Sequence, residues 1–276
     1  MNIFVTRKIP QEGITLLEKH HQVRVSEKNR VLSKKEIINQ ASESEGLLCL
    51  LTDTIDREVI SSLPQLKMIA NYAVGYNNID VSYATSNNIV VSNTPDVLTE
   101  ATAELAWALV FAVSRRIVEA DTFSRDGKFD GWDPMLLLGQ DISSKTLGVV
   151  GTGRIGTAMA QMSKGFNMNI LYVNHQKNNI IENKLNAKKT TLPDLLKRSD
   201  IISLHVPLTD ENKHLIGKKE FSSMKETAIL INTSRGPVID EHALINALKN
   251  NMIFGAGLDV YEDEPKIPTE LKKMNN

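Results

Sequence analysis

Short hydrophobic runs alternate with amphipathic segments along the first third of the chain. The strand-like runs fall at residues 3–5, 23–25, 46–51, 68–70 and 89–91, and helix-like segments lie between them at residues 11–19 and 33–40. A regular alternation of strand and helix is typical of βαβ units, whose strands form a parallel sheet. Residues 1–95 are therefore predicted to form one doubly wound α/β domain.

The rest of the chain repeats this pattern after a long helix. A turn cluster at residues 93–96 precedes residues 99–114, which have the pattern of a helix that is apolar on nearly every side. Such a helix must be covered all round, and both a second domain and a second subunit remain open as its cover. Residues 115–133 are predicted to be a charged loop, and a second alternating series runs over residues 146–260. Residues 96–276 are therefore predicted to form a second doubly wound domain, which makes the fold class α/β with two parallel sheets.

Composition narrows the choice of partner. The chain has 276 residues, which suits two domains of ordinary size, and its 41% hydrophobic and 24% charged residues are typical of a soluble globular protein. The formal net charge of -1 gives no general attraction to nucleic acid or to an anionic membrane. The longest apolar run, residues 105–113, is too short to cross a bilayer. We therefore expect a small-molecule partner, with no nucleic acid and no membrane.

The single cysteine favours a reducing compartment. Cys49 lies inside an apolar run, where a buried and unreactive thiol is far more common than a nucleophile. One cysteine excludes an internal disulfide. The first ten residues also lack the apolar stretch of a signal peptide, so a cytoplasmic location is expected.

A glycine-rich turn opens the second series of elements. A compact apolar strand at residues 145–150 runs into GTGRIG at residues 151–156, and residues 157–164 follow as a helix. In this context Gly151 permits a tight turn, Gly153 lets the backbone approach a pyrophosphate, and Gly156 lets helix and strand pack closely. The helix amino terminus adds free N–H groups for the phosphates, among them those near Arg154 and Ile155. A turn that merely connects strand and helix is the weaker interpretation.

The end of the next strand bears on the choice between NAD and NADP. That strand, residues 169–173, is followed by Asn174 instead of the Asp or Glu that would bond the 2′-hydroxyl of NAD. An acidic residue would also repel the 2′-phosphate of NADP, and here His175 and Lys177 stand close by. We therefore expect a preference for NADPH, or tolerance of both cofactors.

Three later motifs, together with one in the first domain, resemble those of the D-isomer-specific 2-hydroxyacid dehydrogenases. They are LHVPLT at residues 204–209, NTSRG at 232–236, GLDVYEDEP at 257–265 and YAVG at 72–75. GWDP at residues 131–134, ahead of Gly139, is similar to the glyoxylate and hydroxypyruvate reductase branch. The resemblance implies a flavodoxin-like substrate domain, a Rossmann NAD(P)-binding domain, and hydride transfer from a reduced nicotinamide to a small 2-oxo acid.

The resemblance also assigns roles to single residues. Arg235 matches the arginine that holds the substrate, and a planar guanidinium grips carboxylate and carbonyl oxygens in a way that lysine cannot. A lone arginine after a strand would more often be a surface ion-pair partner, but the NTSRG context favours the functional interpretation. Val74 and Gly75 match the loop whose backbone N–H groups bind the substrate carboxylate. The remaining matches are cofactor-side positions, namely Thr99, Val206, Pro207, Thr233 and Asp259.

Glu264 matches the carboxylate that orients a catalytic histidine and raises its pKa. In the family that histidine lies beyond the loop that follows this glutamate, whereas this sequence ends at Asn276 and all six of its histidines precede Glu264. His205 follows a strand at the cofactor edge and stands at a structural or cofactor-facing position of the family pattern. The resemblance thus implies that the return segment of the first domain and the end of the second are absent. We expect cofactor binding with poor turnover, an open edge strand and exposed apolar surface.

Two other functions and an assembly stay open. A cofactor-binding regulatory or inactive dehydrogenase-like protein is the alternative, although the presence of Arg235 and Glu264 speaks against a deliberate loss of chemistry. A short-chain dehydrogenase would carry its glycine loop near the amino terminus, whereas here the loop begins at Gly151. The apolar helix at residues 99–114 suggests a homodimer, because members of the family pair through this region.

Overall fold

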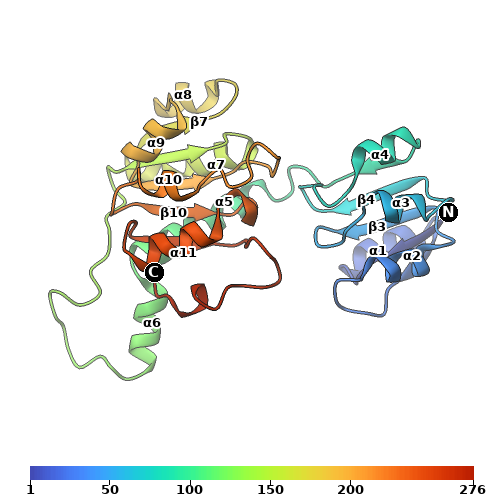
Figure 1. The fold of residues 1–276 in the computed structure, drawn as a ribbon, viewed down its shortest axis with the longest axis horizontal. Helices are drawn as coiled ribbons and strands as arrows, with labels where there is room; N and C mark the ends of the chain where they lie inside the picture. The colour runs from blue at the N-terminus through green and yellow to red at the C-terminus, as the bar shows by residue number, and fades with distance from the viewer. The chain divides into compact units, whose positions relative to one another are not determined.

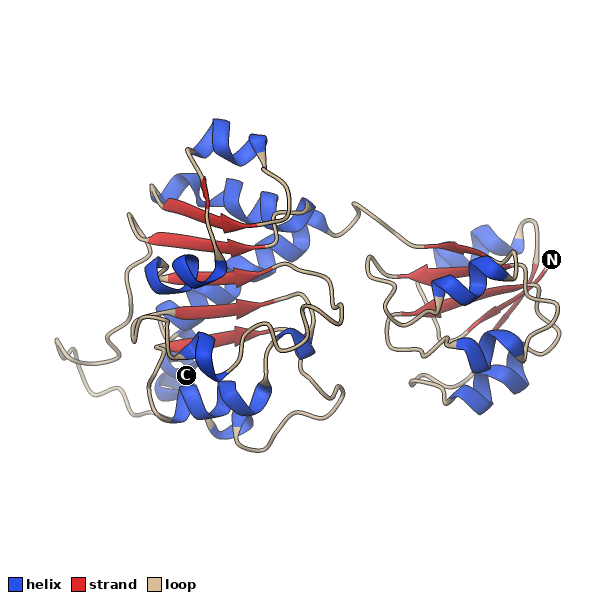
Figure 2. Ribbon diagram, turned by 45° about the horizontal axis from the view of Figure 1, so that its top comes forward, coloured by secondary structure: helices blue, strands red, loops and turns tan.

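The computed structural model describes all residues from 1 to 276 and divides into two compact units. The first unit is Met1–Leu98 and the second unit is Thr99–Asn276 (Figure 1). Each has its own parallel sheet, and Figure 2 shows helices on both faces of each sheet. The two units are therefore described one at a time.

The first unit is a flavodoxin-like domain, as predicted. Its five parallel strands lie in the order β2-β1-β3-β4-β5, the order of the flavodoxin-type doubly wound sheet. The strands are β1 Asn2–Val5, β2 Gln22–Val25, β3 Gly46–Leu50, β4 Met68–Tyr72 and β5 Val90–Ser92. The helices are α1 Gln11–Glu18, α2 Lys34–Ala41, α3 Arg57–Ser61 and α4 Val81–Ser86. Because all strands are parallel, the loops that follow them meet at one edge of the sheet.

Local signals in the sequence explain where these helices begin. Ser33 accepts a hydrogen bond from the backbone of Glu36, whose side chain reaches back to the Ser33 backbone, so α2 starts with a capping box. The carboxylates of Asp56 and Asp80 cap α3 and α4 by accepting from the backbone nitrogens of Val59 and Tyr83. Cys49 is fully buried in the core, and this burial raises the pKa of its thiol to about 12. The predicted burial of this cysteine is confirmed, and a thiol whose pKa is raised is a poor nucleophile.

The second unit has a Rossmann sheet. Its six parallel strands lie in the order β11-β10-β9-β6-β7-β8, which is the dinucleotide-binding order 3-2-1-4-5-6. The strands are β6 Thr146–Val150, β7 Asn169–Val173, β8 Lys188–Lys189, β9 Ile201–Leu204, β10 Ile229–Asn232 and β11 Gly255–Leu258. The helices are α5 Thr99–Ser114, α6 Ile117–Arg125, α7 Arg154–Met162, α8 Asn179–Leu185, α9 Leu192–Arg198, α10 Lys218–Phe221 and α11 Glu241–Lys249. The predicted fold class is confirmed for both units.

Helix α5 belongs to the second unit and covers its sheet. Ala103, Trp107 and Val110 are buried against the core around β6 and α7, and the Trp107 indole donates to the backbone oxygen of Met159 over 3.0 Å. Leu105, on another side of the helix, stays 39% exposed within one chain, so the predicted cover of this side by a second subunit remains a prediction. One face of α5 is thus a core face and the other is an apolar surface.

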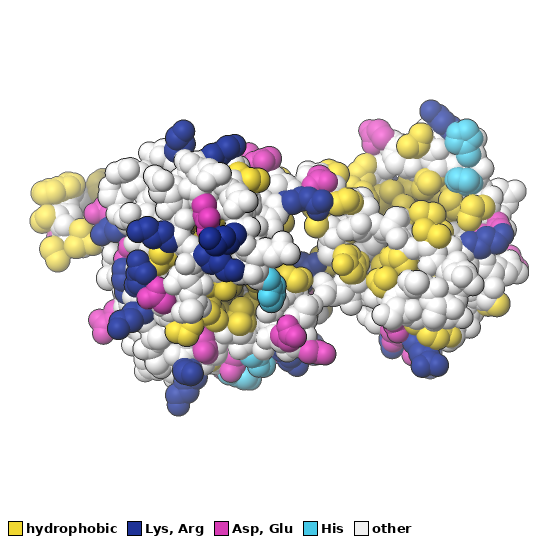
Figure 3. All heavy atoms as spheres, turned by 90° about the horizontal axis from the view of Figure 1, so that it is seen from above, with side chains coloured by type: hydrophobic (Ala, Val, Ile, Leu, Met, Phe, Trp, Pro, Cys, Tyr) yellow, Lys and Arg dark blue, Asp and Glu magenta, His cyan; other side chains and the backbone are white.

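The prediction of a loop over residues 115–133 is also wrong in part, since α6 lies within it. The guanidinium of Arg116 pairs with the carboxylate of Glu119 over 2.7 Å and supports the start of that helix. After α6 the chain carries large exposed apolar side chains, among them Phe129, Trp132 and Met135. Figure 3 shows hydrophobic side chains gathered at the far left, where this segment lies. None of the helices has the length and apolar character needed to cross a membrane.

Candidate active site

The glycine loop, residues 151–156, connects β6 to α7, and its three glycines serve different needs. Gly151 has a φ of +89°, and an added Cβ would lie 2.5 Å from the backbone oxygen of His205. A Cβ at Gly156 would collide with the backbone oxygen of Gly151, so this glycine lets helix and loop pack closely. A Cβ at Gly153 would meet nothing within 4 Å, which leaves room for a ligand beside the loop.

The amino terminus of α7 has the features that a pyrophosphate needs. The helix begins at Arg154, three residues earlier than predicted, because Gly153 already serves as its N-cap and contributes no side-chain hydrogen bond. The first turn of a helix without a side-chain cap offers its N–H groups to an anion. The hydroxyl oxygen of Thr152 is buried and has no hydrogen-bond partner in the chain. The residues of this turn therefore fit a dinucleotide.

Asn178 ties the 174–178 loop, which follows β7, to the glycine loop. Its side-chain nitrogen donates to the backbone oxygen of Thr152 over 3.1 Å and to the hydroxyl of Thr157 over 2.7 Å. Its side-chain oxygen accepts from the first turn of α8. The candidate residues Asn174 and His175 lie in this loop, and Lys189 on β8 donates to the backbone oxygen of His175 over 2.8 Å. The loop is thus held at both ends, with Lys177 exposed between them.

His205 follows β9, and its backbone oxygen lies close to Gly151 of the glycine loop. Its ring nitrogen Nε2 lies 2.8 Å from the hydroxyl of Ser203, and desolvation lowers the pKa of the ring from 6.5 to about 4. The imidazole is therefore neutral near neutral pH. Val206 and Pro207 come directly after it, at the same edge of the sheet.

Arg235 is held in the segment that follows β10. The side chain of Asn232, at the end of that strand, donates to the Arg235 backbone oxygen over 2.9 Å and accepts from the backbone of Ser234 over 3.0 Å. The Arg235 guanidinium is partly buried, which lowers its pKa, while the nearby carboxylate of Glu264 raises it. The neighbouring Thr233 has a buried hydroxyl without a partner. A fixed, desolvated guanidinium of this kind is suited to grip a small carboxylate or carbonyl group.

The turn after β11, residues 259–265, packs directly on the arginine segment. A Cβ at Gly236 would collide with the backbone oxygen of Tyr261, so glycine is required where the two segments cross. The carboxylate of Glu264 accepts from the backbone nitrogen of Tyr261 over 2.9 Å. Burial and the charge of Glu264 both raise the pKa of Asp259. Arg235, Asp259 and Glu264 therefore form one electrostatic group within the second unit.

Hydrogen bonds that involve the side chains of His214, Glu241 and Glu262 hold this turn in place. The Nε2 atom of His214 lies 2.6 Å from one carboxylate oxygen of Glu262, and the other oxygen accepts from the backbone nitrogen of Glu241 over 3.2 Å. Glu241 in turn accepts from the Glu262 backbone over 3.3 Å. Sequence reasoning missed His214 and Glu241, because neither stands in a motif and they meet only through the fold.

In the first unit, Val74 and Gly75 lie in the loop between β4 and α4. The side chain of Asn93 donates to the Val74 backbone oxygen over 2.8 Å, and that of Asn71 donates to the Gly75 backbone oxygen over 2.7 Å. Neither asparagine was predicted as a site residue. Their signal is weak in one sequence, because a strand-end asparagine more often serves a turn alone.

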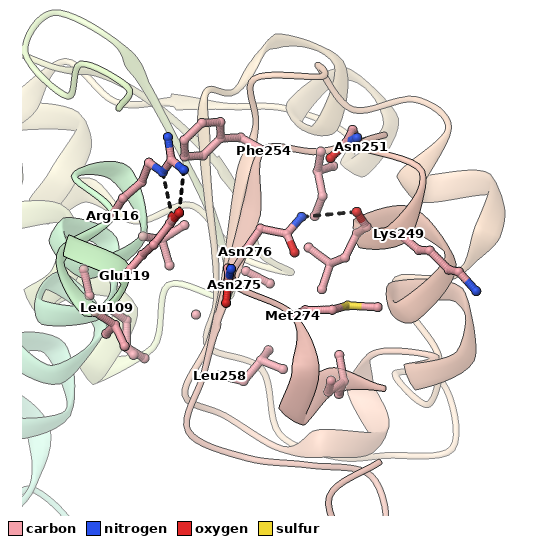
Figure 4. A pocket seen from close by; sticks show the side chains of 18 of the residues that line it. Leu109, Arg116, Glu119, Lys249, Asn251, Phe254, Leu258, Met274, Asn275 and Asn276 are labelled. Atoms are coloured by element: carbon pink, nitrogen blue, oxygen red, sulfur yellow. Dashed lines mark hydrogen bonds and ion pairs between the residues drawn. The ribbon is translucent and has the colours of Figure 1, made fainter. Parts of the chain in front are cut away.

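A large pocket lies elsewhere in the second unit. About 810 Å³ of space adjoins β11 between α5, α6, α11 and the last residues of the chain (Figure 4), and none of the predicted site residues lines it. Its wall includes Leu109, Leu258 and Met274, and the backbone nitrogen of Ala256 on β11 donates to the backbone oxygen of Asn276 over 2.8 Å. β11 is an edge strand of the sheet, and the pocket is the space beside that edge.

Comparison with known sequences decides the family. Residues 107–276 match the family described as D-isomer specific 2-hydroxyacid dehydrogenase, NAD binding domain. The chain belongs to this family. The second unit is therefore a nicotinamide-dinucleotide-binding domain of a 2-hydroxyacid dehydrogenase, and the resemblance drawn from the motifs is confirmed.

Individual members of the 2-hydroxyacid dehydrogenase family are similar along the whole chain. The chain is 49% identical over 278 residues to the glyoxylate reductase of Thermococcus litoralis, a match that covers 99% of this chain and 84% of that protein. Among solved structures, the TT0316 protein from Thermus thermophilus is 40% identical with a TM-score of 0.92, covering 100% of this chain and 87% of that one. The NADPH-dependent glyoxylate/hydroxypyruvate reductase from Sinorhizobium meliloti, solved with NADP and malonate, is 30% identical with a TM-score of 0.88 and covers 99% and 83%.

Proposed function

We propose that this chain reduces glyoxylate or hydroxypyruvate to the 2-hydroxy acid, with NADPH preferred over NADH. The observation that carries the proposal is the glycine loop, whose open side at Gly153 and uncapped helix α7 suit a dinucleotide, in a chain that is similar to glyoxylate reductases over almost its full length. When bound, the reduced nicotinamide supplies a hydride to the carbonyl carbon of the acid. The chain itself binds, orients and polarises that carbonyl.

The second unit would hold the cofactor along the carboxyl edge of its sheet. The N–H groups near Gly151, Gly153, Arg154, Ile155 and Gly156 bind the phosphates, and Val206 and Pro207 flank the adenine. Thr233 and Asp259 lie near the nicotinamide end, and the unpartnered Thr233 hydroxyl is free to bond there. Thr99, at the start of α5, is a further cofactor-side residue. These assignments follow the matched motifs position by position.

Arg235 would grip the carbonyl and carboxylate oxygens of the acid. Its guanidinium is desolvated, and hydrogen bonds to charged groups are strongest in such surroundings. The backbone N–H groups of Val74 and Gly75, in the first unit, would bind the carboxylate. Hydride transfer leaves a negative oxygen that must take up a proton, and by the matched motif Glu264 would orient the group that donates it. The Tyr261 backbone nitrogen fixes one oxygen of the Glu264 carboxylate.

Three features support a preference for NADPH. Asn174 stands where a carboxylate would repel the 2′-phosphate, while Lys177 and Lys189 bring positive charge to the same loop. The Kd for NADPH is expected to be lower than that for NADH, and Lys177→Ala should remove most of the difference. Lys184→Ala, an exposed lysine on α8, is the matched control and should leave the ratio unchanged. Equal or tighter binding of NADH by the wild-type chain would contradict the preference.

Steady-state reduction of glyoxylate by the purified chain tests the main proposal. Oxidation of NADPH that depends on glyoxylate, and that is lost in Arg235→Ala, would support it. Tight dinucleotide binding with no turnover of any 2-oxo acid would instead favour a cofactor-binding protein with a regulatory role. A folded chain that bound neither cofactor would exclude both functions.

We also propose that two chains pair through the outer face of α5 and the segment after α6. Leu105 on α5 and Val118 on α6 are exposed, and Trp132 in the following segment is 84% exposed. Large exposed apolar side chains commonly mark a protein interface, and a second copy offers a surface of the same kind. Light scattering should return twice the mass of one chain. In the Trp132→Asp variant the measured mass should fall towards that of a single chain. We also propose a cytoplasmic location, and the free, buried thiol of Cys49 is consistent with it.

A further inference from the structure

In the loop that carries Val74 and Gly75, the carbonyl groups of residues 73–76 are engaged. The backbone nitrogen of Thr94 donates to the Ala73 oxygen over 2.9 Å, Asn93 donates to the Val74 oxygen, and Asn71 donates to the Gly75 oxygen. The next carbonyl, of Tyr76, accepts from the backbone of Ile79 over 3.1 Å. Four successive carbonyl groups therefore have fixed partners inside the first unit.

Three successive N–H groups of the same loop are left open. The backbone nitrogens of Val74, Gly75 and Tyr76 donate no hydrogen bond within the first unit. Val74 and Gly75 are partly exposed and Tyr76 is 55% exposed, so water or a ligand reaches this backbone. Successive free N–H groups held in one orientation form a site for an anion. The side chains of Asn71 and Asn93 bind the carbonyl oxygens of the loop and leave its N–H groups available.

Asn71 is itself fixed by a buried polar network. Its side-chain oxygen accepts from the Asn78 side chain over 3.3 Å and from the Cys49 thiol over 3.3 Å. Its side-chain nitrogen donates to the Asn78 oxygen over 3.1 Å as well as to Gly75. Asn78 continues the network to the backbone oxygens of Leu50 and Asp53, each over 3.1 Å. With 2% exposure, Asn71 has no freedom to turn away from the loop.

We infer that Asn71 and Asn93 are positioning residues for the substrate carboxylate. They touch no substrate atom. They hold the Val74 and Gly75 carbonyl groups inward so that the adjacent N–H groups face the anion, which pre-organises the site before the acid binds. This inference rests on the proposed function, because it takes the small 2-oxo acid as the anion.

Removal of either side-chain donor should weaken carboxylate binding and spare the chemical step. In Asn93→Ala and Asn71→Asp the KM for glyoxylate at saturating NADPH is expected to rise about tenfold, with kcat changed less than about twofold. The Kd for oxamate, an unreactive analogue of a 2-oxo acid, should rise by the same factor in calorimetric titration. The Kd for NADPH should stay unchanged, because its proposed contacts lie in the second unit.

Asn87→Ala is the matched control. Asn87 makes the same kind of bond, from its side-chain nitrogen to the Tyr83 backbone oxygen over 2.8 Å, but at the end of α4. It should leave the KM and the Kd for oxamate as they are in the wild type. Asn93 is only partly buried, so its variant decides the matter even where Asn71→Asp does not fold.

The outcomes separate this inference from the proposed function. Unchanged KM and oxamate affinity in a folded Asn93→Ala chain would overturn the positioning role and leave the proposed function standing. A lower melting temperature with an unchanged KM would assign the asparagines a structural role only, which also overturns the inference. A wild-type chain that neither reduced glyoxylate nor bound oxamate would overturn the proposed function, and the inference with it.

Discussion

The two units present backbone N–H groups to their proposed ligands in opposite ways. In the first unit, the loop with Val74 and Gly75 is held by the polar side chains of Asn71 and Asn93. In the second unit, the glycine loop is shaped by the lack of side chains, since a Cβ at Gly151 or Gly156 would strike backbone oxygen atoms. One loop is built by adding hydrogen bonds and the other by removing atoms.

This difference predicts how each loop fails. A loop fixed by side-chain hydrogen bonds loses a modest amount of free energy when one donor is removed, because water replaces part of the bond. A loop fixed by close backbone packing has no such replacement, and an added methyl group forces the backbone to move. Substitutions should therefore weaken ligand binding by modest steps in the loop of the first unit, and much more strongly in the glycine loop of the second unit.

The largest effect is expected from substitution of Arg235. This substitution tests whether the guanidinium acts on the carbonyl group during the reaction or only binds the acid. Arg235→Lys keeps the charge but loses the planar fork, so kcat/KM for glyoxylate should fall about 10²- to 10³-fold, mainly through kcat. The Kd for NADPH should be unchanged. A fall confined to KM would mean that Arg235 binds the acid but does not act in the chemical step.

Acid should weaken the second unit through His205. The folded chain protonates this histidine only near pH 4, whereas the unfolded chain does so near pH 6.5. Below pH 6.5 the unfolded state therefore binds more protons, and the free energy of unfolding falls as the pH drops towards 4, by about 3 kcal/mol in all. Urea unfolding of wild type and His205→Gln at pH 7 and at about pH 4.5 measures the difference. An equal loss in both proteins would show that other groups cause it.

A methyl group at Gly156 should be far worse than one at Gly153. Gly156→Ala sets a Cβ against the Gly151 oxygen, so the affinity for NADPH should fall about 10- to 100-fold. Gly153→Ala meets nothing within 4 Å and should fold with an unchanged melting temperature. Similar melting temperatures in the two variants would contradict the account of the glycine loop.

The smallest effect is expected at Asn178, whose side chain ties the loop after β7 to the glycine loop. Asn178→Ala removes one hydrogen bond to that loop and one to Thr157 on α7, and should raise the Kd for NADPH about fivefold. Asn179→Ala, the exposed neighbour, is the control. A loss of NADPH affinity as large as that of Gly156→Ala would show that the glycine loop, too, is held mainly by side-chain hydrogen bonds. The proposed difference between the two loops would then be wrong.

The sequence predicted the backbone features of both units better than their side-chain networks. Strand β7 and helix α5 have the bounds that hydrophobic periodicity and turn residues indicated, and the glycine loop lies where its motif placed it. Helix α6 was missed because its charged, weakly periodic residues have the composition of a loop. His214, Glu262 and Glu241 meet from three separate segments, and Asn71 and Asn93 from two strand ends. Contacts between segments so far apart in sequence depend on the packing of the whole fold, which local patterns do not carry.

The central claim is that phosphates bind the glycine loop while the acid's carboxylate binds the Val74–Gly75 loop. Backbone amide NMR of the wild-type chain, titrated first with NADPH and then with oxamate, tests both halves together. We predict that NADPH shifts the amide signals of residues 151–156 and that oxamate then shifts those of residues 74–76. Shifts from NADPH that cluster at the pocket beside β11, with the glycine loop unmoved, would contradict the account.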